Sequence, residues 1–83
     1  MNLTAAFVKL PDREAEIRRL AGCDESFRSL CEDLGDAVRA LDHWLSASSA
    51  HVADRISEYQ ALVDALVAEM RASLDAASEK AAG

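Results

Sequence analysis

Large apolar residues recur at gaps of three and four through two long stretches of the chain, and this spacing is the period of an amphipathic helix. The first stretch predicts a helix over about 24–46 and contains Phe27, Leu30, Cys31, Leu34, Val38, Leu41, Trp44 and Leu45. The second predicts a helix over about 50–78 and contains Val52, Ile56, Tyr59, Leu62, Val63, Leu66, Val67, Met70 and Leu74. Except for Cys31, these residues are the candidate core and interface positions.

A shorter helix is predicted before them, over about 12–21. Pro11 suits the first turn of a helix, because its missing N–H would have no partner there. Gly22 is expected to end this helix as the residue after its C-cap, and Asp24 to cap the start of the next.

The 83 residues are enough for one domain, close to the lower limit for a chain that folds alone. We expect an arm without a clear period over 1–11, a single helical domain over 12–78, and a frayed tail over 79–83. The sequence leaves open whether the arm is ordered.

The stretch between the two long helices allows two interpretations. Apolar spacing continues through it, so one uninterrupted helix is compatible with the pattern. Against this, Ser46, Ser48 and Ser49 cluster where large apolar residues lapse, and serine favours caps and turns. Ser48 or Ser49 is placed to cap the second long helix. We therefore favour a short turn between antiparallel helices.

Charge and composition argue against several partners. Fifteen acidic and nine basic residues give a formal charge of −6, so neither nucleic acid nor an anionic membrane is expected to bind. No apolar run approaches the roughly 20 residues of a membrane span. The N-terminus lacks the basic region of a secretory signal, and two cysteines are too few for a disulfide scaffold. A cytoplasmic protein with reduced thiols is expected.

Two cysteines and two histidines raise the question of a zinc site. Zinc signatures place paired ligands two to five residues apart. Here Cys23 and Cys31, like His43 and His51, are eight residues apart, about 12 Å along a helix. We therefore expect no metal site and no cofactor, with the two thiols in the core and the two imidazoles at the surface.

Catalytic chemistry is not expected either. Glu32 and Asp33 follow Cys31 directly, and their negative charge disfavours the thiolate that a nucleophilic cysteine needs. The sequence contains no glycine-rich phosphate loop and no hydrolase or metalloprotease motif. We therefore assign no catalytic residues and predict a protein that is not an enzyme.

The apolar stripes of the two long helices are wider than the narrow seam that one partner helix requires. In the shorter helix, only Ile17 and Leu20 are available to cover the excess. The fold expected is all-α: a short N-terminal helix, then a two-helix antiparallel hairpin that dimerises into a four-helix bundle. A monomeric three-helix domain is the alternative. Trp44 would close one end of the bundle or act as a binding hot spot, and the sequence does not decide which.

The function expected is interaction, through a homodimer and through a further protein partner that the sequence does not identify. A small metal or ligand carrier is the alternative, with thiols and imidazoles of more than one chain forming a shared site.

A family resemblance covers about residues 12–75. The run "DREAEIRRLAGCDESFRSLCEDLGDAVRALDHW" followed by "RISEYQALVDALVAEMRASL" resembles small bacterial helical-hairpin proteins of the YdcH-like kind. The positions that carry the resemblance are Ile17, Leu20, Asp24, Phe27, Leu30, Leu62, Leu66 and Leu74. The chain lacks the lysines typical of that group's last helix. The resemblance implies a small helical protein without assigned catalytic residues.

A second resemblance concerns Trp44, Leu45 and Ser46 at the interhelical turn. They are similar to the Trp-x-Gly turn of small bacterial secreted hairpins that pair as dimers, although serine stands here in place of the glycine. Tyr59 also lacks the tail signal of that family. This resemblance implies a third function, that of a secreted hairpin substrate.

The stripe assignment is tested by Leu66→Asp, which places a charge at the centre of the second long stripe. We expect the folded assembly to be lost, because an unpaired charge inside an apolar core costs several kcal/mol. Thermal unfolding and sedimentation measure the outcome. An unchanged thermal midpoint and mass would contradict the assignment.

Overall fold

A computed structural model describes residues 2–48 and 50–82, and every regular element in this part of the chain is helical. The elements are α1 (Thr4–Lys9), the 3₁₀ turn η1 (Pro11–Arg13), α2 (Glu14–Cys23), α3 (Glu25–Leu45) and α4 (Val52–Ala82). No strand occurs in these residues. The all-α class expected from the sequence is confirmed.

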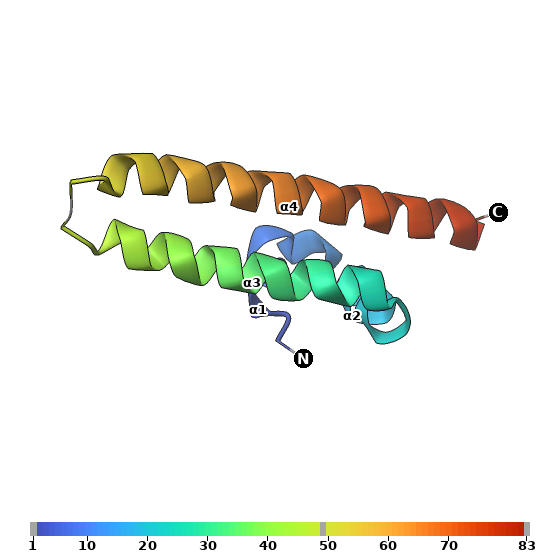
Figure 1. Cartoon of the computed structure of the whole chain (residues 1–83). Helices are drawn as coiled ribbons and strands as arrows, with labels where there is room; N and C mark the ends of the chain where they lie inside the picture. The colour runs from blue at the N-terminus through green and yellow to red at the C-terminus, as the bar shows by residue number, and fades with distance from the viewer. Residues whose placement is uncertain (1, 49, 83) are drawn as a thin grey trace.

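The two long helices form the frame of the molecule, which measures 52 × 21 × 20 Å. α3 and α4 lie side by side and run in opposite directions, and α1 and α2 pack against the pair (Figure 1). The chain therefore has two helices where one continuous helix was the alternative. At the end of α3, the Ser46 hydroxyl donates to the Asp42 carbonyl at 2.8 Å.

Ser48 was expected as one of two possible caps of α4, and this is wrong, because α4 begins at Val52. The Arg55 N–H donates to the His51 carbonyl, which puts His51 at the cap position. Ser49, the other serine expected to cap α4, lies outside the described residues.

The junction between α2 and α3 differs from the expectation at one residue. Asp24 caps α3 as predicted, because its carboxylate accepts the N–H of Phe27 at 3.0 Å. Gly22 was expected to end the preceding helix, and this is wrong, since α2 continues through it to Cys23. None of the described glycines has a positive φ. The extended backbone of Asp24 (φ −128°, ψ 108°) turns the chain instead.

Both ends of the chain contain more helix than the spacing of apolar residues predicted. Residues 4–9 of the expected arm form α1, which buries Ala6 completely. The Arg18 guanidinium lies over the Phe7 ring, 4.6 Å from its centroid, and joins α1 to α2. At the other end, α4 continues to residue 82, beyond the predicted boundary at 78. The Ser78 hydroxyl donates to Glu16 at 3.1 Å, so this part of α4 contacts α2.

All four α-helices contribute to one core. Its members are at most 9% exposed, and they are Ala6, Leu10, Ile17, Ala21, Phe27, Cys31, Leu34, Ala37, Leu41, Val63, Leu66, Met70 and Leu74. Leu10 and Ile17 come from the N-terminal third and lie against the long helices. Much of the wide apolar stripe is therefore covered from within the chain.

Within residues 2–48 and 50–82, none of the helices combines the length and the apolar content that a membrane span requires.

The Asp24 cap gives a testable prediction. Asp24→Ala should lower the free energy of unfolding by about 1 kcal/mol, because the Phe27 N–H loses its acceptor. Asp24→Asn is the matched control, since asparagine keeps a side-chain oxygen at the cap, and it should stay within a few tenths of a kcal/mol of the parent. Urea denaturation followed by circular dichroism measures both. Equal losses in the two variants would contradict the role of the cap.

Candidate functional site

The two edges of α4 have different surroundings. On one edge the N-terminal segment contacts it: Arg13 pairs with Asp75 at 2.6 Å, and Glu16 accepts from Ser78. At about 100° per residue, Leu62 falls on the opposite edge. Its side chain is 44% exposed.

The edges of α3 differ in the same way. The Arg28 guanidinium donates to the Ala21 carbonyl of α2 at 2.9 Å. On the same side, Gly35 and Val38 line a cavity together with α1. By helical geometry Leu30 and Trp44 lie toward the other edge, where both are half-buried.

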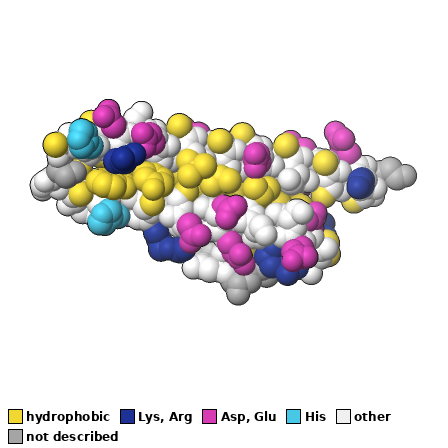
Figure 2. Space-filling view, viewed as in Figure 1, with side chains coloured by type: hydrophobic (Ala, Val, Ile, Leu, Met, Phe, Trp, Pro, Cys, Tyr) yellow, Lys and Arg dark blue, Asp and Glu magenta, His cyan; other side chains and the backbone are white. Residues whose placement is uncertain are grey.

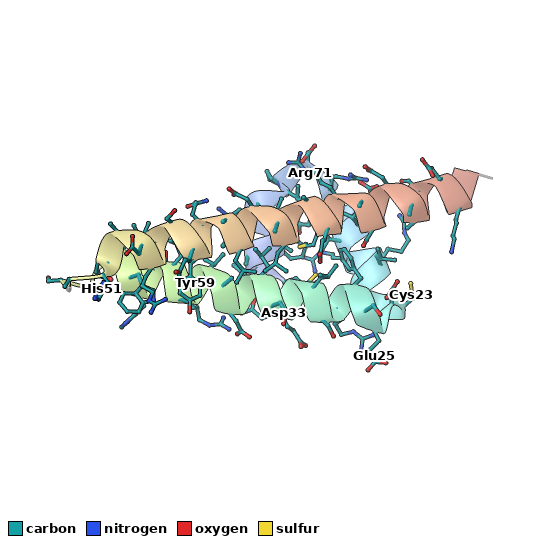
Figure 3. The ribbon with its side chains drawn as sticks, turned by 45° about the horizontal axis from the view of Figure 1, so that its top comes forward. Cys23, Glu25, Asp33, His51, Tyr59 and Arg71 are labelled. Carbon is teal, nitrogen blue, oxygen red and sulfur yellow. The ribbon has the colours of Figure 1, made fainter. Side chains whose placement is uncertain are left out.

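The side of the α3–α4 pair away from the N-terminal helices is the open face. We define it by three residues of each helix, of which Leu30, Trp44, Tyr59 and Leu62 are half-buried or exposed, and Ala37 and Leu66 are buried beneath them: Leu30, Ala37, Trp44, Tyr59, Leu62 and Leu66. Figure 2 shows a continuous band of hydrophobic side chains along the seam between the two helices. Figure 3 places Tyr59 at this seam and Arg71 at the far edge of α4.

Polar side chains border the open face. Asp33 of α3 and Glu69 of α4 are exposed, and Arg55 of α4 pairs with Glu58 at 2.8 Å. An apolar centre with an aromatic residue and a charged rim is the usual anatomy of a protein interface. The arrangement is suited to binding an apolar surface.

The sixteen candidate core and interface residues fall into three groups. Seven are buried: Phe27, Leu34, Leu41, Val63, Leu66, Met70 and Leu74. Seven are half-buried: Leu30, Val38, Trp44, Val52, Ile56, Tyr59 and Val67. The remaining two are exposed, Leu45 at 60% and Leu62 at 44%.

The sequence pattern of large apolar residues did not identify three small residues that the core also contains: Ala6, Ala21 and Ala37. A signal was present for Ala37, which lies three residues after Leu34 and four before Leu41. It therefore continues the helical period, with little bulk at the middle of the open face.

Trp44 lies in the last turn of α3, on the open face. Its ring makes an edge contact with His43, with centroids 5.3 Å apart and planes at 79°. The indole is half-buried, so part of its apolar surface remains accessible to solvent. Aromatic residues in this position are typical of interface anchors.

The cysteines and histidines are spread over the molecule. Cys31 is buried as expected, but Cys23 is exposed, so the prediction that both thiols lie in the core is wrong for Cys23. It follows Gly22 at the last position of α2, outside the apolar stripes. His43 and His51 are exposed, as predicted. Cys23 and His51 are at opposite ends of the molecule (Figure 3).

The placement of these groups bears on metal binding and on the reactivity of Cys31. In the described part of the chain, no three His, Cys, Asp or Glu side chains are placed to share an ion. Burial raises the pKa of the Cys31 thiol, and the charge of Glu32 raises it further. The sequence predicted this direction from neighbouring acidic residues, but burial is the larger cause.

A cavity of about 520 Å³ lies between α1 and α3. Its lining includes Thr4, Val8, Glu32, Asp36 and Arg39. Asp36 and Arg39 form an ion pair with each other, so their charges are already matched. Apolar atoms of Ala5, Val8 and Val38 lie beside these charges in the lining.

Comparison with known proteins gives no relative: no protein family, no curated protein and no solved structure matches the chain.

The contact between α2 and α4 gives a prediction for acid stability. Hydrogen bonds from Arg13, and then from Ser78, lower the pKa of Glu16. Because the folded-state pKa lies below the unfolded value, Glu16 stabilises the fold above about pH 4.3 and loses this contribution as the pH falls further. We expect Glu16→Gln to reduce the loss of stability between neutral and acidic pH.

Thermal unfolding across this pH range measures the effect. Arg13→Gln removes the donor and should reduce the same pH dependence. An unchanged pH profile in both variants would contradict the assignment.

Proposed function

We propose that the protein is a non-enzymatic interaction protein whose open face binds a second copy of the chain. Two α3–α4 hairpins would pack face to face as a four-helix bundle, with α1 and α2 on the outside of each. The proposal includes no catalytic residue, cofactor, nucleic acid or membrane. The resemblance to YdcH-like proteins remains a prediction and is compatible with it.

One observation carries the proposal: Leu62 is 44% exposed in the middle of an apolar face that the N-terminal helices do not reach. Tyr59 precedes it by three residues and Leu66 follows by four, so the three form one stripe. Apolar surface removed from water contributes about 25 cal/mol per Å². Covering the face is therefore favourable, and a second copy is the partner most often used.

The position of α1 and α2 also argues against the alternative of a monomeric three-helix domain, in which the N-terminal helix covers the apolar stripes of α3 and α4. These helices fill the side of the α3–α4 pair that carries Val67 and Asp75, and the opposite side keeps its apolar band. Covering both sides of the α3–α4 pair would need a further helix. All helices of the described residues already have a place in the arrangement of Figure 1, with α1 and α2 on one side.

We further propose that this association takes place in the cytoplasm. Cys23 has an exposed free thiol, which is compatible with a reducing compartment, and the surface carries the excess negative charge.

The proposal predicts a compact dimer by sedimentation velocity over a concentration series. Leu62→Glu should give a folded monomer, because two carboxylates would be buried against apolar surface in the dimer. Val8→Glu is the matched control: Val8 is 69% exposed on α1, outside the open face, and the change adds the same charge. It should remain dimeric.

Circular dichroism checks that both variants keep their helix content. A monomeric parent protein at all concentrations, or an unchanged dimer of Leu62→Glu, would overturn the proposal.

A further inference from the structure

The charges beside the open face indicate how the two copies are oriented. We infer that they meet antiparallel, about a two-fold axis that passes between Leu62 of each chain and lies across the helices. α4 then faces the partner's α4, and Arg55 pairs with the partner's Glu69. The inference rests on the proposed homodimer and adds its register.

The positions of the two charges on α4 support this axis. Arg55 lies seven residues before Leu62, and Glu69 lies seven residues after it. Seven residues make about two turns, so both charges lie near the same edge of the helix as Leu62. An antiparallel crossing at Leu62 therefore brings Arg55 opposite the partner's Glu69, twice in each dimer.

Both charged groups are accessible for such a pair. The Arg55 side chain is 49% exposed, and its only described ion-pair partner is Glu58, which is 60% exposed. Glu69 is exposed on the rim. Arg55 would thus lie between two carboxylates, one from each chain, and its guanidinium has enough donors for both.

α3 independently supports the same axis. Leu30 and Trp44 are each seven residues from Ala37, one on either side. Ala37 lies eight residues before the end of α3, about 12 Å from the turn. Leu62 lies ten residues after the start of α4, about 15 Å from the turn. The two centres are therefore at nearly the same height. The axis places Leu30 against the partner's Trp44.

The other face-to-face arrangement has the two-fold axis along the helices, with α4 against the partner's α3. Glu69 would then lie beside the open edge of α3, where Asp33 is exposed. The two arginines of α3 do not compensate, because Arg28 donates to Ala21 and Arg39 pairs with Asp36. The charge pattern therefore favours the antiparallel register.

The overlap of the two chains in this register sets the size of the contact. The axis at Leu62 pairs residue 52 with residue 72, an overlap of about 30 Å along α4. Together with the molecular width of 21 Å, this overlap gives each chain a footprint of roughly 600 Å² on its partner. The total of roughly 1,200 Å² is the lower end of the range for stable protein interfaces.

Charge reversal tests the register. Arg55→Glu and Glu69→Arg should each weaken dimerisation about tenfold, because each creates two like-charged contacts per dimer. The double variant, Arg55→Glu with Glu69→Arg, exchanges the charges and should return the dissociation constant to within about threefold of the parent. Analytical ultracentrifugation measures all four proteins, and circular dichroism confirms that each is folded.

Cysteine cross-linking provides a second measurement, in a Cys23→Ser background that removes the exposed native thiol. Leu62→Cys should form a disulfide-linked dimer under mild oxidation, because the axis brings the two positions together. Glu69→Cys is the control. Its two copies would be 14 residues apart along the antiparallel helices, about 21 Å, and should not link.

The results separate the two proposals. Weakened single variants with a restored double variant, together with a Leu62→Cys link, support the register. A dimer that the reversals leave unchanged, or that the double variant does not restore, overturns the register and leaves the homodimer standing. A parent protein that sediments only as a monomer overturns both.

Discussion

The structure depends on a mismatch between the apolar stripes of two long helices and the seam that two helices share. α3 and α4 carry large side chains over a wider arc than their mutual contact can bury. The chain reduces this mismatch by folding α1 and α2 onto one side, where Leu10 and Ile17 complete the core. The other side keeps an apolar band, and the proposed function follows from that asymmetry.

Polar contacts between distant parts of the sequence lie on the side of α4 that the N-terminal helices cover. Arg13 contacts Glu16 locally and Asp75 across 62 positions, and Ser78 contacts Glu16 over the same separation. Asp75 is 63% exposed, and ion pairs of such groups contribute little to stability. These contacts mark the edge of α4 on which the N-terminal segment lies. The buried aliphatic residues stabilise the arrangement.

The sequence predicted best the elements in which the helical spacing of apolar residues repeats over many positions. Phe27 to Leu45 and Val52 to Leu74 each extend over several turns, so the helical spacing is unambiguous. The Asp24 cap was predictable from local chemistry alone. α1 was not, because six residues make less than two turns and a tertiary contact, the burial of Ala6, decides their structure. Gly22 misled for a related reason: glycine permits a left-handed helix end without requiring one.

The open face was beyond sequence reasoning, although most of its members were named as candidates. Which edge of α4 faces solvent, and so whether Leu62 is exposed, depends on where α1 and α2 dock. The spacing of apolar residues contains no information on that docking position.

The two cysteines differ in a way that gives the protein an internal reporter. Cys23 is exposed at the end of α2, and Cys31 is buried one helix further along, with a raised thiol pKa. A thiol-specific reagent therefore modifies one site in the folded chain and two in the unfolded chain. The slower of the two reactions measures how often α3 leaves the core, without any substitution in the sequence.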